Sequence, residues 1–142
     1  MKRILFLCTG NSCRSQMAQV LMNELGNGRF AASSAGSKPA GAVHPLAIRT
    51  LQEAKLPTDG LRSKSWEEFR GQAFDVVVTV CDRAQESCPT FPGKVTKLHW
   101  GFEDPAEATG TEEQKRQVFR RVFDEIRERI QLFLALPVQG SL

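Results

Sequence analysis

The sequence predicts an α/β protein built on a four-stranded parallel sheet. Short apolar runs alternate along the chain with longer segments whose apolar residues recur at helical spacing. The clearest apolar run, residues 74–80, is rich in valine, as expected for a strand that is covered on both faces. Since strand–helix–strand units cross over in a right-handed sense, the simplest arrangement is a flavodoxin-like, doubly wound sheet with strand order 2-1-3-4.

Two strands and two helices are expected in the first half of the chain. The apolar residues 4–7 predict the first strand, and the spacing of apolar residues over 16–25 predicts a helix after it. Residues 30–34 suit a short second strand. A second helix over 45–54 follows, because proline at position 45 is favourable in a first helical turn.

The second half begins with a polar, irregular stretch, residues 58–71, in which a short helical turn is expected at 66–69. The run at 74–80 is the third strand, and a weaker fourth strand covers 95–98. The last helix begins near Thr111, where the sequence TEEQ fits a capping box. Its apolar stripe, which indicates the buried face, consists of Val118, Phe119, Val122, Phe123, Ile126, Ile130, Phe133 and Leu134.

Length and composition indicate one globular domain over residues 1–142. The chain is 41% hydrophobic and 25% charged, and its net charge of +3 comes from interspersed charges, so we expect no nucleic-acid partner. The run at 4–7 is too short for a signal-peptide core, and no stretch approaches the roughly 20 apolar residues of a membrane span. We therefore expect a cytoplasmic monomer with no membrane partner, in a compartment where cysteines stay reduced.

A loop with the sequence CTGNSCRS, residues 8–15, connects the first strand with the first helix. A loop that enters a helix N-terminus directs backbone N–H groups at one point, which suits an oxyanion. Gly10 and Asn11 tolerate the positive φ that such a nest needs, and the planar guanidinium of Arg14 can hold two anion oxygens. The oxyanion-binding residues of this loop are Thr9, Gly10, Asn11, Ser12, Cys13 and Arg14.

Cys8 stands out within this loop for its chemistry. Because it faces the loop dipoles and Arg14, its thiol is expected to have a lowered pKa and to exist largely as the thiolate. Ser15 could donate a hydrogen bond to the sulfur. The alternative is that Cys8 is merely a buried residue at the end of a strand and Arg14 a surface residue. The anion chemistry does not require the Cys13 thiol, for which we expect a packing role.

Two further segments reach the same edge of the predicted sheet. Neighbouring strands lie about 4.8 Å apart. Cys81 ends the third strand and Cys8 the first, so both should reach the carboxyl edge, where α/β sites form. Asp104 follows the fourth strand in the sequence HWGFEDPAE and could act there as a general acid or base. The alternative for an Asp-Pro pair is a simple turn.

Together these residues resemble a known family. The C-x5-R-S loop after the first strand and the late Asp-Pro are similar to the low-molecular-weight protein tyrosine phosphatase fold. CTGNSCRSQMA, VVVTVC, a second cysteine seven residues on and HWGFEDPA resemble the thioredoxin-coupled arsenate reductases built on that fold. Gln19 and Ser65 replace the acidic side chains with which some of these reductases bind a monovalent cation, so the resemblance does not extend to that site.

The resemblance implies an arsenate reductase with neither cofactor nor metal. The catalytic residues are then Cys8, Arg14, Ser15, Cys81, Cys88 and Asp104. Cys8 would attack arsenate, Asp104 would carry the proton, and Cys81 and Cys88 would form a disulfide relay. A thiol reductant would regenerate the relay, and thioredoxin is favoured over glutaredoxin or glutathione.

Other functions remain open alongside this one. A low-molecular-weight protein tyrosine phosphatase would use the same loop, but such enzymes usually have tyrosines after the Asp-Pro, and this chain has no tyrosine at all. A non-enzymatic arsenite-binding protein would use the thiols but has no need of Arg14 or Asp104. Zinc binding is not expected, because the cysteine spacings are unusual for zinc and the two histidines, His44 and His99, are isolated.

The segment between Cys81 and Cys88 is predicted to be helical when the two thiols are reduced. Its residues DRAQES form helices well, and Pro89 ends the segment. In a helix the two Cα atoms would lie about 10.5 Å apart, whereas a disulfide tolerates at most about 6.8 Å. The segment would therefore have to unwind before the two thiols could bond.

Overall fold

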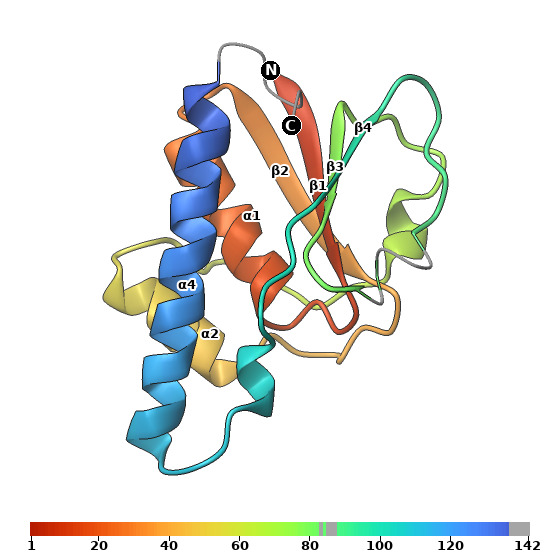
Figure 1. Cartoon of the computed structure of the whole chain (residues 1–142). Coiled ribbons are helices and arrows are strands. Elements are labelled where there is room, and N and C mark those ends of the chain that lie inside the picture. The colour runs from red at the N-terminus through yellow and green to blue at the C-terminus, as the bar shows by residue number, and fades with distance from the viewer. Residues whose placement is uncertain (83, 85–87, 137–142) are drawn as a thin grey trace.

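One parallel, four-stranded sheet forms the centre of the computed structural model, which describes residues 1–82, 84 and 88–136. The strands are β1 (Lys2–Cys8), β2 (Phe30–Gly36), β3 (Val76–Thr79) and β4 (Thr96–His99). They are hydrogen-bonded in the order β2-β1-β3-β4, and every neighbouring pair is parallel (Figure 1). The predicted α/β sheet with strand order 2-1-3-4 is confirmed.

The helices are gathered mainly on one face of this sheet. The elements that flank it are α1 (Arg14–Leu25), α2 (Pro45–Glu53) and α4 (Glu112–Ala135), with the short 3-10 turns η1 (Trp66–Phe69) and η2 (Pro105–Glu107). Figure 1 shows α1, α2 and α4 together on one side, with η1 on the other. Both faces of the central strands are therefore covered, which explains why all of β3 is buried.

The long last helix, α4, packs against α1 and α2. Its capping box is present, since Gln114 N–H donates to Thr111 Oγ1 and Thr111 N–H donates to Gln114 Oε1. At its far end the Phe133 ring packs against Trp100, with ring centroids 5.7 Å apart, and Trp100 packs in turn on Phe6. This aromatic contact ties α4 to the segment after β4.

The observed boundaries differ from the predicted ones by a few residues. β1 is longer than the predicted 4–7, and α1 begins at Arg14 rather than at residue 16. β3 is shorter than the predicted 74–80, because its ladder with β1 pairs only residues 76–79. The helix predicted between Cys81 and Cys88 falls mainly on residues 83 and 85–87, which lie outside the described residues.

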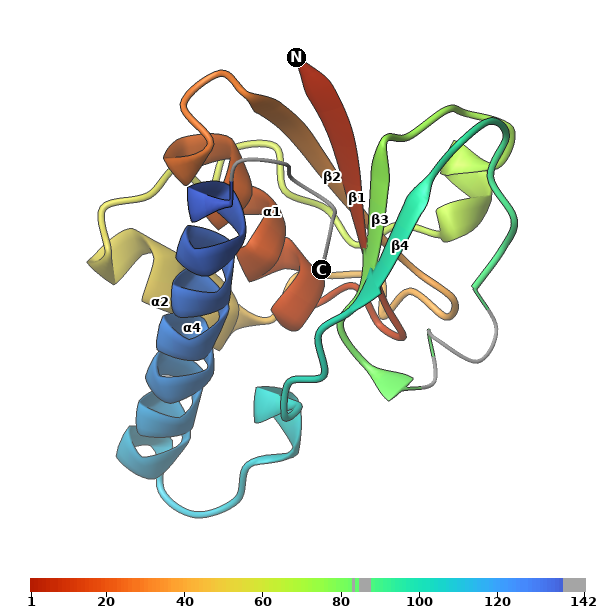
Figure 2. The same ribbon diagram turned by 45° about the horizontal axis from the view of Figure 1, so that its top comes forward.

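The carboxyl ends of the four strands meet at one edge of the molecule (Figure 2). The loop before α1 and the segments that follow β2, β3 and β4 all start there. This convergence is a consequence of parallel strands, and it brings together residues from four distant parts of the chain.

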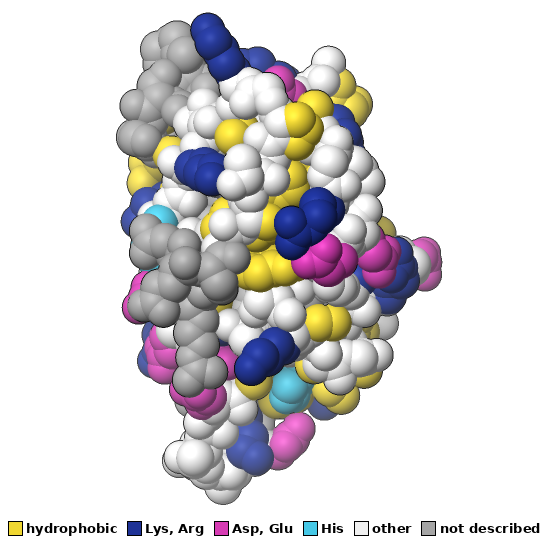
Figure 3. Space-filling model, turned by 90° about the vertical axis from the view of Figure 1, so that its right-hand side faces the viewer, with side chains coloured by type: hydrophobic (Ala, Val, Ile, Leu, Met, Phe, Trp, Pro, Cys, Tyr) yellow, Lys and Arg dark blue, Asp and Glu magenta, His cyan; other side chains and the backbone are white. Residues whose placement is uncertain are grey.

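Charged side chains of both signs are interspersed over the face shown in Figure 3, in keeping with the pattern of the sequence. No helix in the described part of the chain is both long and apolar enough to cross a membrane.

Candidate active site

The loop between β1 and α1 is held in place by backbone hydrogen bonds to the segment after β2. The carbonyl oxygens of Thr9, Gly10 and Ser12 accept N–H groups of residues 38, 40 and 44 at 2.9 to 3.0 Å. Gly36 allows this close approach, since a Cβ atom there would lie 2.4 Å from the Thr9 carbonyl oxygen. The loop carbonyls are thereby engaged outside the loop, which suits a site for an anion.

Asn11 is the buried centre of the loop. Its φ of 50° confirms the positive φ predicted for it, whereas Gly10, for which the same was expected, does not adopt one. The Asn11 side chain accepts the Lys64 N–H at 3.0 Å and a Gln16 amide N–H at 2.9 Å, and it donates to Ser15 Oγ at 2.8 Å. A segment fifty residues away in the sequence therefore supports the loop from beneath.

The Cys8 thiol lies at the bottom of this loop and is almost fully buried. Ser15 Oγ lies 2.8 Å from the sulfur, and the Asn11 N–H donates to it at 3.1 Å. Burial raises the pKa of Cys8 above its ordinary value, while these two hydrogen bonds and the Arg14 charge lower it by less. The predicted lowering of the Cys8 pKa is therefore wrong for this structure, because desolvation of the thiolate exceeds the favourable contacts.

Removing the Ser15 hydroxyl should reduce the thiolate fraction of Cys8 further. A hydrogen bond to a charged group contributes about 1.5 to 3 kcal/mol, so Ser15→Ala should slow alkylation of Cys8 by iodoacetamide at neutral pH about tenfold or more. The measurement is the rate of Cys8 alkylation against pH, followed by peptide mass spectrometry, and the whole profile should move to higher pH. Ser33→Ala, the same change on a neighbouring strand, serves as the control. Superimposable profiles for Ser15→Ala and the control would show that the Ser15 contact does not stabilise the thiolate.

Arg14 and Asp104 form the opposite wall. Arg14 Nη2 lies 3.6 Å from Asp104 Oδ2, and Arg14 Nη1 donates to the Phe102 carbonyl oxygen at 2.9 Å. Asp104 also caps η2, because its Oδ1 accepts the Ala106 N–H at 3.0 Å. The Asp-Pro turn thus places a carboxylate and a guanidinium side by side, about a third and an eighth exposed respectively.

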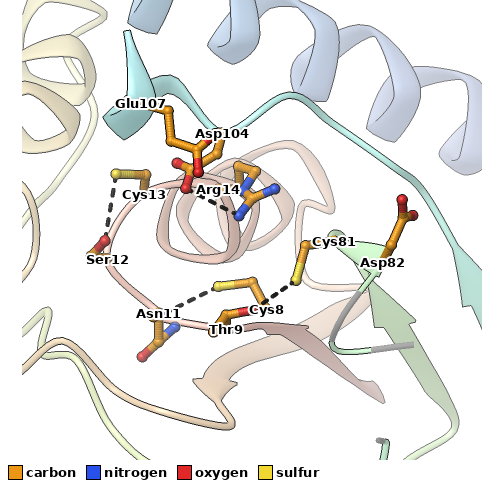
Figure 4. Close-up of a pocket in the computed structure, with 11 residues that line it drawn as sticks. Cys8, Thr9, Asn11, Ser12, Cys13, Arg14, Cys81, Asp82, Asp104 and Glu107 are labelled. Atoms are coloured by element: carbon orange, nitrogen blue, oxygen red, sulfur yellow. Dashed lines mark hydrogen bonds and ion pairs between the residues drawn. The ribbon is translucent and has the colours of Figure 1, made fainter. Parts of the chain in front are cut away.

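The Cys8 loop and the wall formed by Arg14 and Asp104 enclose a cavity of about 450 Å³ (Figure 4). Its lining residues are Cys8, Thr9, Gly10, Asn11, Ser12, Cys13, Arg14, Cys81, Asp82, Asp104 and Glu107. All six residues predicted to bind the oxyanion are among them. Sequence reasoning missed Asp82 and Glu107. Their only signal was proximity in sequence to Cys81 and to Asp104.

Cys81 shares this cavity with Cys8. It is nearly buried, and its sulfur lies 3.3 Å from Thr9 Oγ1. In Figure 4 the side chains of Cys8 and Cys81 both project into the space beside Thr9. The prediction that these two cysteines meet at the carboxyl edge of the sheet is confirmed.

Cys88 is not brought to the same place. It is half-buried and lines a second cavity, of about 270 Å³, together with Lys97 and His99 from β4 and Val77 and Thr79 from β3. Burial raises the pKa of the Cys88 thiol, and Lys97 lowers it by less. The four cysteines are free thiols.

Cys13 has surroundings that fit a packing role. Burial raises the pKa of its thiol to about 12, so it stays protonated at neutral pH. It is the N-cap residue of α1 but its side chain makes no cap hydrogen bond in the described structure. The Cys13 sulfur therefore does not compete with an anion for the first N–H groups of the helix.

The described residues offer no cluster of metal ligands. No group of three or more His, Cys, Asp or Glu side chains among them is arranged to hold a metal ion.

Comparison with known proteins identifies the family. The sequence model of the family described as low molecular weight phosphotyrosine protein phosphatase matches residues 3–139. The chain belongs to this family. Among curated relatives, the arsenate reductases of Halalkalibacterium halodurans and Bacillus subtilis are 43% and 41% identical, each over 93% of this chain and 94% of the relative.

Solved structures of the family give the same result. A structure described as an arsenate reductase in the phosphate binding state is 32% identical, with a TM-score of 0.75, covering 95% of this chain and 98% of that one. The thioredoxin-dependent arsenate reductase of Corynebacterium glutamicum is 29% identical with a TM-score of 0.66, covering 93% of this chain and 63% of that one. The resemblance predicted from the sequence is confirmed.

Proposed function

We propose that this protein reduces arsenate to arsenite with a relay of three cysteines that a thioredoxin regenerates. The observation that carries the proposal is the cavity in which Cys8, Arg14 and Asp104 lie with a second buried thiol, Cys81. The first three would suffice for phosphoryl transfer. A second thiol is useful only if the reaction transfers electrons.

The first step is the attack of Cys8 on arsenic. The Cys8 thiol loses its proton, aided by Ser15, the Asn11 N–H and Arg14, and a sulfur–arsenic bond forms. The proton passes by way of Asp104 to a hydroxyl of arsenate, which leaves as water when the arsenic–oxygen bond breaks. Arg14, whose guanidinium lies beside Asp104 at the mouth of the loop, holds the remaining oxygens, because a planar guanidinium can bind two anion oxygens at once.

The second step reduces arsenic. The Cys81 thiolate attacks the Cys8 sulfur, so a Cys8–Cys81 disulfide forms and the sulfur–arsenic bond breaks. The bonding pair remains on arsenic, which passes from As(V) to As(III), and two thiol sulfurs are oxidised. Cys81 has a short approach, since it reaches the same cavity and contacts Thr9, the residue after Cys8.

The last steps free Cys8 and restore the enzyme. Cys88 attacks Cys81, which forms a Cys81–Cys88 disulfide and releases the Cys8 thiolate. Cys88 must first leave its own cavity beside β3 and β4. An external dithiol then reduces the Cys81–Cys88 bond, and we propose thioredoxin for it in the reducing cytoplasm, as in the Corynebacterium glutamicum relative that is described as thioredoxin-dependent.

A low-molecular-weight protein tyrosine phosphatase is the second candidate. The family model, the Cys8 loop and Asp104 all fit it. The cavity next to Asp104 is instead lined by Glu107, and the chain has no tyrosine that could stack on a substrate ring. Cys81 in the cavity has no function in phosphoester hydrolysis.

A coupled assay tests the proposal. Arsenate-dependent oxidation of NADPH should occur with thioredoxin and thioredoxin reductase, because the relay ends in a disulfide that a dithiol protein reduces. It should be much slower with glutaredoxin, glutathione and glutathione reductase. Failure of both reductant systems, together with efficient hydrolysis of p-nitrophenyl phosphate, would identify the protein as a phosphatase.

A further inference from the structure

Two successive side-chain hydrogen bonds connect the sheet to the first residue after Cys81. Thr79 and His99 are the last residues of β3 and β4 and are paired in register. Thr79 Oγ1 lies 2.8 Å from His99 Nδ1, and His99 Nε2 lies 2.9 Å from Asp82 Oδ1. One imidazole therefore joins a buried hydroxyl of the sheet to a carboxylate of the segment that carries the two relay thiols.

These hydrogen bonds lie between the two cavities that contain the relay thiols. Asp82 lines the cavity of Cys8 and Cys81, whereas Thr79 and His99 line the cavity of Cys88. The His99–Asp82 contact thus lies between the two cavities. Gly101 lies beside the contact, since a Cβ atom there would lie at ordinary van der Waals distance from both, 3.4 Å from His99 Nε2 and 3.8 Å from Asp82 Oδ1.

The two partners differ greatly in solvent exposure. The Asp82 side chain is 88% exposed and has a helical backbone, while the His99 side chain is only 25% exposed and is held by Thr79. The imidazole is therefore held at the edge of the sheet, and it in turn holds Asp82 through a hydrogen bond. The thiols are free, so this contact belongs to the reduced protein.

We infer that His99 is a positioning residue for the redox step, which holds Asp82 and so favours the reduced arrangement of Cys81 and Cys88. The inference rests on the proposed relay, because it concerns the Cys81–Cys88 disulfide. For that bond the two Cα atoms must approach within about 6.8 Å. Because Cys81 and Cys88 line different cavities, at least one of these thiols must leave its cavity, and the His99–Asp82 contact joins the residue after Cys81 to the lining of the Cys88 cavity. The His99–Asp82 contact is lost in the process.

The consequence is a shift of the thiol–disulfide equilibrium. An exposed hydrogen bond of this kind contributes up to about 1 kcal/mol, which corresponds to a roughly three- to fivefold change in the equilibrium constant. Without the contact, the equilibrium constant for formation of the Cys81–Cys88 disulfide rises by this factor. At about 30 mV per tenfold change for a two-electron couple, the reduction potential should fall by about 15 to 20 mV.

The test is a redox titration of the Cys81–Cys88 pair in a Cys8→Ser background, where Cys8 cannot interfere. The protein is equilibrated with mixtures of reduced and oxidised dithiothreitol, which exchange two electrons and two protons with the pair. Free thiols are then alkylated and assigned by peptide mass spectrometry. Asp82→Ala and His99→Gln should each lower the potential by the same amount, and the double variant by no more than either. Asp59→Ala, which removes an exposed carboxylate elsewhere, is the matched control.

Two results would overturn the inference. One is an unchanged potential in Asp82→Ala. The other is a double variant whose shift is the sum of two single shifts, which would show that Asp82 and His99 act independently. Failure of the relay itself has a different signature: the Cys81–Cys88 disulfide would then not form even in the parent protein.

Discussion

A Cys8→Ser variant is expected to lose arsenate reduction and the hydrolysis of p-nitrophenyl phosphate together, each by at least about a thousandfold. Both reactions begin with the attack of the same sulfur, which lies at the bottom of the loop against Ser15 and Asn11. A serine hydroxyl in this position is a far weaker nucleophile than a thiolate. Both activities are measured on the same preparation.

The matched control is Cys88→Ser, the same chemical change outside the Cys8 cavity. Its hydrolysis of p-nitrophenyl phosphate should remain close to that of the parent protein. Substantial arsenate reduction by Cys8→Ser would show that another thiol starts the reaction.

The second large effect separates the two chemistries. Cys81→Ser and Cys88→Ser should keep phosphoester hydrolysis, because the loop, Arg14 and Asp104 are intact. Both should lose multiple-turnover reduction of arsenate, because the electrons come from the relay thiols. The measurement compares the two steady-state activities in each variant. If either variant lost both activities to the same extent, Cys81 or Cys88 would be part of the site of hydrolysis and the division of functions would be wrong.

The sheet and the gathering of the site could be predicted from the sequence for a simple physical reason. Parallel strands place their carboxyl ends at one edge, so Cys8, Cys81 and Asp104 had to approach one another once the strand order was known. The loop sequence also indicated an anion site, because glycine, asparagine and arginine at a helix start have few other joint uses. These predictions depend on local pattern and topology.

The pKa of Cys8 could not be predicted in this way. Whether the pKa of Cys8 is raised or lowered depends on how completely the sulfur is desolvated. The extent of desolvation is set by the packing of segments that lie far away in the sequence. Gly36 lies against the loop, and Lys64 and Gln16 fix Asn11 beneath it. The loop sequence alone shows the dipoles that favour the thiolate, but not the burial that opposes them.

The positions of Cys88 and Asp82 could not be predicted from the sequence either. A spacing of seven residues is compatible with one shared site or with two cavities, and the structure has two. The contact of Asp82 depends on His99, seventeen residues away on the neighbouring strand. Pairing of this kind follows from strand register, which the sequence of β3 does not specify to the residue because that strand is buried on both faces and shows no alternation.

The central claim is that Cys81 attacks the Cys8 sulfur, so that the two thiols reduce arsenic together before Cys88 acts. It is tested most directly by mixing reduced Cys88→Ser protein with excess arsenate, quenching with acid and mapping the disulfides by mass spectrometry. We predict one arsenite per protein molecule and a Cys8–Cys81 disulfide that accumulates, because Cys88, the thiol that would resolve it, has been removed. Steady turnover of Cys88→Ser with thioredoxin, without accumulation of that disulfide, would contradict the relay.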